Sequence, residues 1–204
     1  MQCFLTMKKI FAILLSAMIL CTSCEYRLSS DVADDNSVVS IERYDRLESR
    51  YLTTGDFAAL QQMSTEYPVE TRMLIEDILN IGDVKDHEIN TRFLQFFQDS
   101  LLQVMISDVE QEYANMDDLN TQLAESFERL TELLPDIEKP RFYAQITALD
   151  QSIVVGNQTV AISLDKYMGK DYPLYAQFYK EEQRLTMSRK YIVPDCLSFY
   201  ILSL

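Results

Sequence analysis

Histidine, glycine and cysteine are all scarce in this sequence, and each shortage excludes a class of function. The 204 residues include one histidine, His87, whereas a zincin-type hydrolase needs at least two histidines at helical spacing to hold its zinc. The four glycines form neither a Gly-rich phosphate-binding loop nor a Gly-x-Ser-x-Gly nucleophile elbow. The sequence therefore predicts a protein that is not an enzyme, with no catalytic residue, no metal site and no cofactor.

Two residues have side chains that act as catalysts in other proteins, but neither has the sequence context that catalysis needs. His87 stands in the polar segment Val84–Glu88, where we interpret it as a solvated loop residue, because a general base also needs an orienting partner. Cys196 falls in an apolar helical pattern, where burial keeps a thiol protonated and structural. If the protein were an enzyme, a pocket would have to bring acidic side chains close to His87 or Cys196.

Basic residues are outnumbered by acidic ones, 18 to 32, which gives a formal net charge of −14 at pH 7. A surface of this sign repels phosphate backbones and anionic headgroups, so we expect no nucleic-acid partner and no basic membrane-docking face. Adjacent acids such as Asp117 with Asp118 and Glu181 with Glu182 arise by chance in so acidic a chain. Glycosidase chemistry needs two carboxylates that converge in space, which adjacency does not supply.

The N-terminal segment has the layout of a secretory signal peptide. Lys8 and Lys9 are followed by the apolar run from Ile10 to Leu20 and then by small residues. This run is shorter than the ~20 helical residues that cross a hydrocarbon core, so a lasting transmembrane helix is the weaker interpretation. Met7 would give a tighter signal peptide than Met1 does.

The signal peptide ends in a sequence typical of a lipobox, in which a cysteine becomes the first residue of the mature protein. Thr22 and Ser23 supply the small residues before Cys24, whereas the alternative, Cys21, follows the bulky Leu20. We predict cleavage between Ser23 and Cys24 and acylation of Cys24 by chains such as palmitate. More than one acyl chain is needed for stable anchoring in a membrane, and a lipidated Cys24 meets that need. An ordinary cleaved signal peptide is the alternative.

Cleavage after Ser23 changes the composition of the remaining chain. Loss of residues 1–23 removes two lysines and no acid, so the net charge moves from −14 to −16. Cys196 is then the one cysteine besides the lipidated Cys24, which excludes a disulfide framework and a cysteine-rich metal site. Residues 24–38 are rich in serine and aspartate, cannot bury a face, and are predicted to be a flexible acidic tether. Residues 39–204 then form a single domain.

Most of this domain has helical spacing of its apolar residues. Tyr44, Leu47 and Tyr51 share one helical face, and Gly55 ends that segment. The pattern recurs in the segments 57–63, 73–79, 93–106 and 119–134. Asp56 is expected to cap the second segment, and Asp117 and Asp118 are expected to cap the last one.

The pattern changes near Arg141, where residues 141–165 become rich in β-branched side chains. Gly156 and Asn157 indicate a hairpin turn, so we expect a small antiparallel sheet made of this hairpin plus one further strand. Helices are expected to return at 176–187 and again near the C-terminus. The predicted fold class is therefore α+β, with a mostly helical N-terminal two thirds.

The segment 162–175, with the sequence ISLDKYMGKDYPLY, resembles the gliding-motility lipoprotein B (GldB) family of Bacteroidetes. The lipobox, a Phe-rich helical segment ending in Asp99, and the later Tyr191–Asp195 stretch add to this resemblance, which spans about residue 38 to the end. The motif positions are Leu164, Asp165, Tyr167, Gly169, Asp171 and Tyr175. Structural roles alone account for these residue types, because Gly169 permits a turn and the tyrosines pack or cap it.

The resemblance implies a lipoprotein of the cell envelope, in the outer membrane, linked with gliding motility or with the associated protein secretion. The family's fold is similar to that of some metallopeptidases without their His-Glu-x-x-His zinc motif, which this sequence also lacks. Members generally continue beyond the point where this chain ends, so a C-terminally shortened domain is implied. The acids behind Cys24 resemble export signals of some Bacteroidetes lipoproteins, so the domain faces either the periplasm or the cell exterior.

Two functions of different classes follow. The first is a non-enzymatic lipoprotein, held at the membrane by the lipid on Cys24, whose acidic domain binds an envelope protein partner through contacts that exposed tyrosines favour. The alternative is a degenerate metallopeptidase-like domain that binds a peptide or small ligand without zinc or catalysis. In that case an extended peptide would add to the strand edge beside the hairpin.

Overall fold

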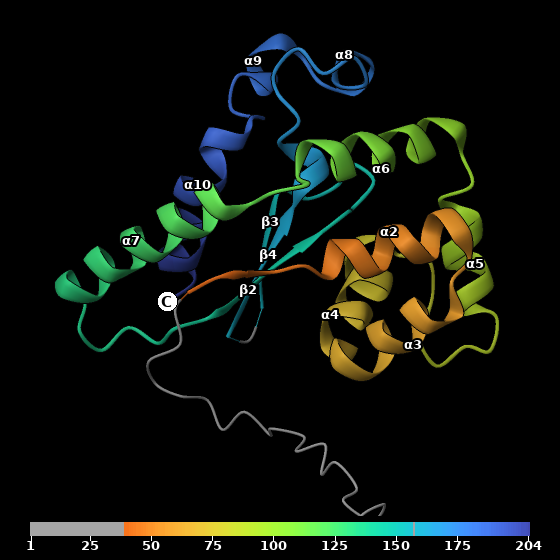
Figure 1. Cartoon of the computed structure of the whole chain (residues 1–204), viewed down its shortest axis with the longest axis horizontal. Helices are drawn as coiled ribbons and strands as arrows, with labels where there is room; N and C mark the ends of the chain where they lie inside the picture. Colours follow the sequence, from red (N-terminus) through yellow and green to blue (C-terminus); the bar gives the residue numbers. More distant parts are fainter. Residues whose placement is uncertain (1–38, 157) are drawn as a thin grey trace, which may run out of the picture. The chain divides into compact units, whose positions relative to one another are not determined.

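The computed structural model describes residues 39–156 and 158–204, which fold around a four-stranded sheet (Figure 1). The predicted signal peptide, the lipidation candidates Cys24 and Cys21, the cleavage site at Ser23 and the acidic tether lie outside these residues. Within the described ranges, no helix combines the length and the apolar character that crossing a membrane requires.

Helices come before the three longer strands and again after them, which confirms the α+β class. The first part of the chain forms β1 (Ile41–Glu42), α2 (Tyr44–Thr54), α3 (Phe57–Glu66), α4 (Pro68–Arg72), the π-helix η1 (Met73–Ile78), α5 (Ile89–Phe96), α6 (Ser100–Glu112) and α7 (Asp117–Leu133). The second part forms β2 (Arg141–Gln145), β3 (Ile153–Gly156), β4 (Thr159–Ser163), η2 (Leu164–Lys166), α8 (Tyr175–Phe178), α9 (Glu181–Arg184), η3 (Arg189–Tyr191) and α10 (Ile192–Ser203).

The sheet has the strand order β1-β2-β4-β3 and mixes both pairing directions. The predicted hairpin is confirmed, because β3 and β4 pair antiparallel with Val154 opposite Ala161. The expectation of a wholly antiparallel sheet is wrong, because β2 pairs in parallel with β4, with Tyr143 opposite Ala161. The physical reason is that β4 inserts between β2 and β3, so that β2 meets the second strand of the hairpin. The carboxyl ends of β2 and β4 therefore lie at the same edge of the sheet.

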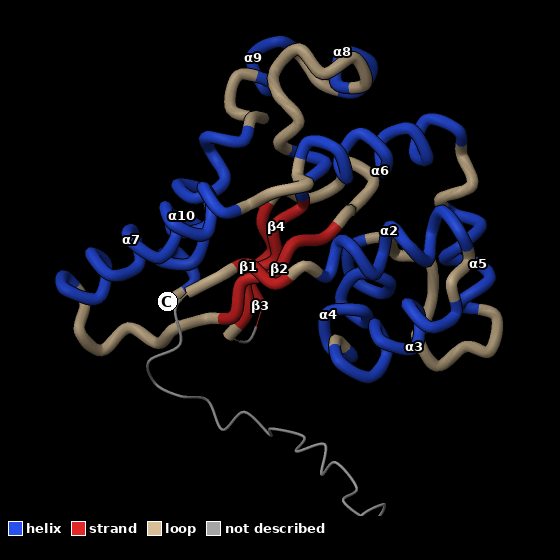
Figure 2. Tube along the Cα trace, viewed as in Figure 1, coloured by secondary structure: helices blue, strands red, loops and turns tan. Residues whose placement is uncertain are grey.

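Helices lie on both faces of the sheet (Figure 2). The ring contacts of successive residues along β2 show which helices cover each face. The Phe142 ring lies 6.2 Å from that of Phe127 in α7, and Phe127 lies 6.4 Å from Tyr200 in α10, centroid to centroid. The next residue, Tyr143, points the opposite way, and its ring centroid is 6.0 Å from that of Tyr44 in α2. The core thus forms two layers of side chains, one on either side of the strands.

Local sequence signals set several helix ends as predicted. Gly55 adopts a left-handed φ of 70° at the end of α2, and its N–H donates to Tyr51 O over 2.8 Å. The Asp56 carboxylate accepts from Ala58 N over 2.8 Å and caps α3. The predicted caps of α7 are wrong, because Asp117 lies within its first turn and Asn115 Oδ1 accepts the Asp117 N–H over 2.7 Å.

The predicted continuous helix over 176–187 is also wrong. The segment forms two short helices, α8 and α9, and Tyr179 between them has an extended backbone, with φ −128° and ψ 141°. The Tyr179 hydroxyl contacts Leu149 O, and Lys166 Nζ donates to that hydroxyl over 2.8 Å. These long-range contacts hold the Tyr179 hydroxyl at Leu149 O, a position that a continuous helix would not allow. Tertiary contacts therefore override the local helix propensity.

Candidate functional site

Asp165 of the family motif lies at the centre of the site, directly after β4 in η2. It is fully buried, and its carboxylate accepts from Thr147 N over 3.0 Å and from Leu149 N over 2.6 Å. The two residues at this bend, Ala148 and Leu149, have left-handed φ values of 52° and 67°. That conformation costs a non-glycine residue about 1–2 kcal/mol, and the two hydrogen bonds to a charged acceptor offset the cost. Asp165 therefore determines the shape of the loop that follows β2.

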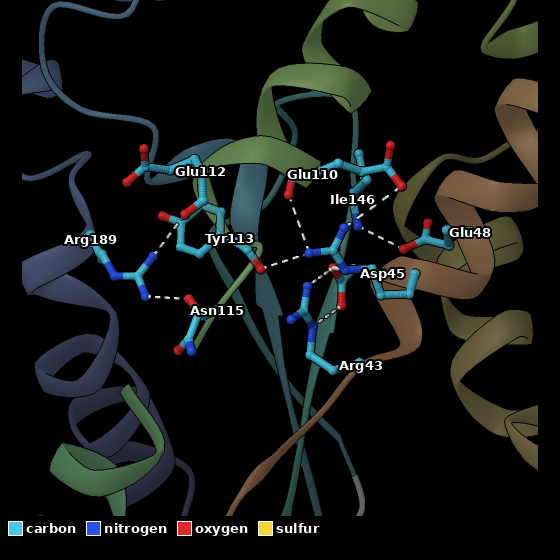
Figure 3. A network of polar contacts seen from close by, with 10 residues as sticks. Arg43, Asp45, Glu48, Glu110, Glu112, Tyr113, Asn115, Ile146 and Arg189 are labelled. Atoms are coloured by element: carbon cyan, nitrogen blue, oxygen red, sulfur yellow. Dashed lines mark hydrogen bonds and ion pairs between the residues drawn. The ribbon is translucent and has the colours of Figure 1, made fainter. Parts of the chain in front are cut away.

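A second buried carboxylate, Glu48 of α2, binds the backbone where this loop begins. Glu48 of α2 accepts from Ile146 N through Oε2 over 2.8 Å, one residue before the loop amides that Asp165 binds (Figure 3). Glu48 Oε1 is buried and has no hydrogen-bond partner in the described part of the chain. Burial raises the pKa of Glu48 well above its usual value, the Ile146 N–H opposes this rise, and repulsion from Asp45 and Asp165 adds to it. Burial also raises the pKa of Asp165, against the Leu149 and Thr147 N–H bonds.

Glu48 lies beside the predicted core face of α2, of which Tyr44 and Tyr51 are buried as expected, and the spacing of that face did not indicate it. The predicted face was Tyr44, Leu47 and Tyr51, but Leu47 is partly exposed while Glu48 is fully buried. A signal was present, because Tyr44, Glu48 and the buried Leu52 recur at intervals of four residues. An acid in the middle of an apolar stripe is a candidate buried group.

Two arginines at the start of α2 have separate roles: Arg43 pairs with the buried Asp45 (Figure 3), and Arg46 links α2 to the end of α6. The Asp45 carboxylate accepts from Arg43 Nε over 2.8 Å and from Arg43 Nη2 over 2.7 Å. Arg46 Nη2 donates to the backbone oxygens of Glu110 and Tyr113, over 3.2 and 2.8 Å. Asp45 is therefore paired, whereas Glu48 forms no ion pair with any residue that the structure describes.

The tyrosines of the motif form hydrogen bonds inside the protein. The Tyr175 hydroxyl donates to Asp165 O over 2.6 Å and accepts from Met168 N over 2.9 Å. The Tyr167 hydroxyl donates to Asp195 Oδ2 over 2.8 Å, and Tyr113 donates to Tyr167 O over 2.7 Å. The expectation of exposed tyrosines is wrong for the described residues, where every tyrosine is buried or half-buried. The hydroxyls of the motif tyrosines Tyr167 and Tyr175 have partners inside the protein, so their rings add to the core without leaving an unpaired polar group, whereas the buried Tyr143 hydroxyl has no partner among the described residues.

The remaining motif positions differ in exposure. Leu164 is fully buried, and Gly169 has a φ of 104°, with its N–H donating to Met187 O over 2.9 Å. Asp171 stands apart, because its side chain is 86% exposed and its Oδ2 lies 3.9 Å from Lys170 Nζ. The motif therefore builds a scaffold, and Asp171 is the position that this scaffold does not use.

An apolar groove of about 370 Å³ lies against the loop that Asp165 shapes. Its walls come from α5, α6, α8 and the loop, and they include Phe96, Leu101, Ala148, Leu149, Leu174 and Phe178. Phe96 is 39% exposed, Leu101 44% and Phe178 61%, so large apolar side chains at this site face water. Such a surface is suited to binding an apolar group.

The two candidate catalytic residues are not brought together. The His87 side chain is 90% exposed, with Nδ1 3.3 Å from Asp86 Oδ1. Cys196 is buried in α10, where burial raises the pKa of its thiol. Of the adjacent acids, Asp118 is ion-paired with Arg189, with Oδ1 and Nη2 2.6 Å apart. In the described ranges, no three His, Cys, Asp or Glu side chains are grouped so as to hold a metal ion.

We predict that Asp165→Asn lowers the free energy of unfolding by about 2–4 kcal/mol, because an amide has one acceptor oxygen for two buried N–H donors. Urea unfolding of the full chain measures this cost. Asp171→Asn makes the same chemical change at an exposed position of the motif and should stay within about 0.5 kcal/mol of wild type. Equal effects of the two substitutions would contradict the central role of Asp165.

We predict that the stability difference between wild type and Glu48→Gln depends on pH. The folded pKa of Glu48 lies above its usual value of 4.5, so the stability that the protonated acid contributes is complete below pH 4.5 and is lost as the pH rises through the folded pKa. The free energy of unfolding of the variant should therefore rise relative to that of wild type between about pH 5 and pH 8. Urea unfolding of both proteins at each pH measures the difference. Glu132→Gln, at an exposed position of α7, should show no such trend.

Comparison with known proteins agrees with the motif. A family model described as "Gliding motility protein GldB" matches residues 25–204. No curated protein and no solved structure matches the chain. The match covers most of the chain and contains both the buried Asp165 site and the apolar groove. The chain therefore belongs to the gliding motility protein GldB family.

Proposed function

We propose that this protein is a non-enzymatic lipoprotein, anchored in the outer membrane by lipid on Cys24, whose domain binds an envelope protein partner through the apolar groove. The basic, apolar and small-residue order of the N-terminus supports the anchor. The family match begins at residue 25, immediately after Cys24, and so leaves the predicted signal peptide outside the matched residues.

The groove is the observation that carries the proposal of partner binding. Its lining includes Ala148 and Leu149, and the buried Asp165 accepts the Leu149 N–H. A binding site that is already ordered loses little conformational entropy when a partner binds. The half-exposed Phe96, Leu101 and Phe178 would be removed from water by an apolar side chain of that partner.

The charge of the protein indicates what surrounds that apolar contact. A net charge of −14 attracts partners whose surfaces are basic and raises the rate at which they meet the protein. Asp99 lines the groove itself and places a carboxylate at its wall. The occupant that fits this chemistry is an apolar side chain from a basic segment of an envelope protein.

The absence of catalysis in this proposal rests on the positions of the candidate groups. His87 projects into water, Cys196 is enclosed in α10, and the acids Asp165 and Glu48 bind backbone amides. Each group with catalytic potential is thus separated from the groove or engaged in holding its loop.

We predict that Cys24→Ala releases the protein from the membrane fraction, whereas Cys21→Ala leaves it there. Removal of the acylated thiol removes the chains that supply about 0.8 kcal/mol per buried methylene. Detergent-free lysis, sedimentation and immunoblotting of both variants measure the distribution. The anchor assignment is wrong if the Cys24 variant is processed and still pellets, or if the Cys21 variant is the one released.

We predict that Phe178→Ser reduces cross-linking of the protein to its envelope partner in intact cells. Phe178 is 61% exposed, so the substitution removes an apolar contact at the groove with little effect on folding. The matched control is Leu133→Ser, because Leu133 is 78% exposed on α7 and does not line the groove. Quantitative mass spectrometry of cross-linked proteins should show loss for Phe178→Ser alone. Equal recovery from both variants would place the partner elsewhere.

A further inference from the structure

A second, smaller hollow lies next to the apolar groove and has a different character. Its volume is about 160 Å³, and its polar lining includes Ser152, Lys166, Tyr167, Thr186 and Asp195. Tyr179 lines both this hollow and the groove, so the two sites share one wall. A single segment of a bound protein can therefore reach both.

Asp195 is a half-buried carboxylate that faces this hollow. Its Oδ2 accepts from the Tyr167 hydroxyl over 2.8 Å, and the Tyr167 hydroxyl is in turn hydrogen-bonded to Ser152. Burial raises the pKa of Asp195, and the Tyr167 hydrogen bond opposes this rise. Among the described residues, no basic side chain forms an ion pair with Asp195, so its charge is neutralised by no neighbour. A partly desolvated carboxylate in this position favours a cation in the space before it.

Lys166 lines the same hollow but does not serve as that cation. Its Nζ donates to Leu149 O and Asp150 O, each over 3.2 Å, and to the Tyr179 hydroxyl over 2.8 Å. An ammonium group has three N–H donors, and these contacts use all of them. Lys166 thus helps to shape the loop and leaves Asp195 available.

We propose that this hollow binds the primary ammonium group of a lysine side chain from the protein partner, with Asp195 as its counter-ion. The Ser152 and Thr186 hydroxyls offer further acceptors around it, which suits a donor-only ammonium group. The shared wall at Tyr179 allows one partner segment to place an apolar side chain in the groove and a lysine in the hollow. This inference rests on the proposed partner binding and names its chemistry.

The test uses n-butylammonium chloride as a mimic of the lysine side chain, with purified full-length lipoprotein in detergent micelles. Met187 lines the hollow and is 7% exposed, so its methyl group, labelled with carbon-13, reports on occupancy by NMR. We expect a saturable shift of the Met187 methyl signal with n-butylammonium, and none with 1-butanol or with sodium chloride at equal ionic strength. Asp195→Asn should weaken binding at least about tenfold, the loss expected for one hydrogen bond between charged groups.

Two further variants keep the test decisive. Thr186→Val removes one hydroxyl at an exposed position and should weaken binding while leaving the fold intact, which covers the case in which Asp195→Asn unfolds. Glu132→Gln removes an equal charge on α7 and should leave the affinity unchanged. A Met187 shift that is equal for n-butylammonium and 1-butanol, or that survives Asp195→Asn, overturns the proposal.

Alaninamide separates a lysine side chain from the other source of a primary ammonium group, the N-terminus of a peptide. Binding of alaninamide without binding of n-butylammonium would overturn the assignment to lysine. The outcome is independent of the cross-linking experiment, because the small cation needs no partner. If n-butylammonium fails to bind while Phe178→Ser still reduces cross-linking, the proposal for the groove is kept and the lysine site is overturned.

Discussion

The buried carboxylate of Asp165 connects the two parallel strands at the centre of the sheet. It follows β4 directly, and it accepts the N–H groups of Thr147 and Leu149, which follow β2. Because β2 and β4 run in parallel, their ends meet at one edge, and the side chain spans the gap between them. The loop held by this contact contains the left-handed Ala148 and Leu149, which line the groove, and its Leu149 O accepts from Lys166 Nζ. Without this acceptor the Thr147 and Leu149 N–H groups would be buried without a partner, which destabilises the loop.

The family motif extends this arrangement outward through hydroxyl groups. Tyr175 binds the backbone of Asp165, while Tyr179 and Lys166 converge on Leu149 O from the other side. A tyrosine contributes a large apolar ring to the core and a polar tip that satisfies a backbone group. The rings of Tyr175 and Tyr179 also pack edge to face, with centroids 5.8 Å apart. The groove and the polar hollow are two faces of this one scaffold.

Several carboxylates of this protein are buried, and their surroundings differ. Glu70 is almost fully buried and is paired with Arg141, whose Nη1 lies 3.1 Å from Glu70 Oε1. Asp165 is satisfied by backbone amides, whereas Glu48 has one satisfied and one unsatisfied oxygen. Asp195 is half-buried at the surface hollow with a tyrosine as its donor. The buried acids are thus held by an arginine or by backbone amides, whereas the half-buried Asp195 is held by a tyrosine hydroxyl.

The sequence by itself determined the features that depend on neighbouring residues. Gly55 and Asp56 marked a helix end and a helix start, the β-branched run predicted the β3–β4 hairpin, and the motif at 164–175 identified the family. The signals at Cys24 and Ser23 are of the same local kind and stay a prediction, because they lie outside the described residues. These features follow from backbone preferences and side-chain spacing within a few residues, which a sequence displays directly.

Tertiary structure alone decided the rest. Residue spacing did not indicate four features of the structure. These are the parallel pairing of β2, the burial of Glu48, the break in the helix at Tyr179, and the groove and hollow that Tyr179 separates. Each depends on partners many positions away, since Asp165 meets Thr147 across 18 residues and Glu48 meets Ile146 across 98. A motif can show that Asp165 and Tyr175 belong together. The motif does not show which backbone amides Asp165 and Tyr175 bind, or which surface results. The pairing of the strands and the packing of the helices decide this, because those contacts form only in the folded chain.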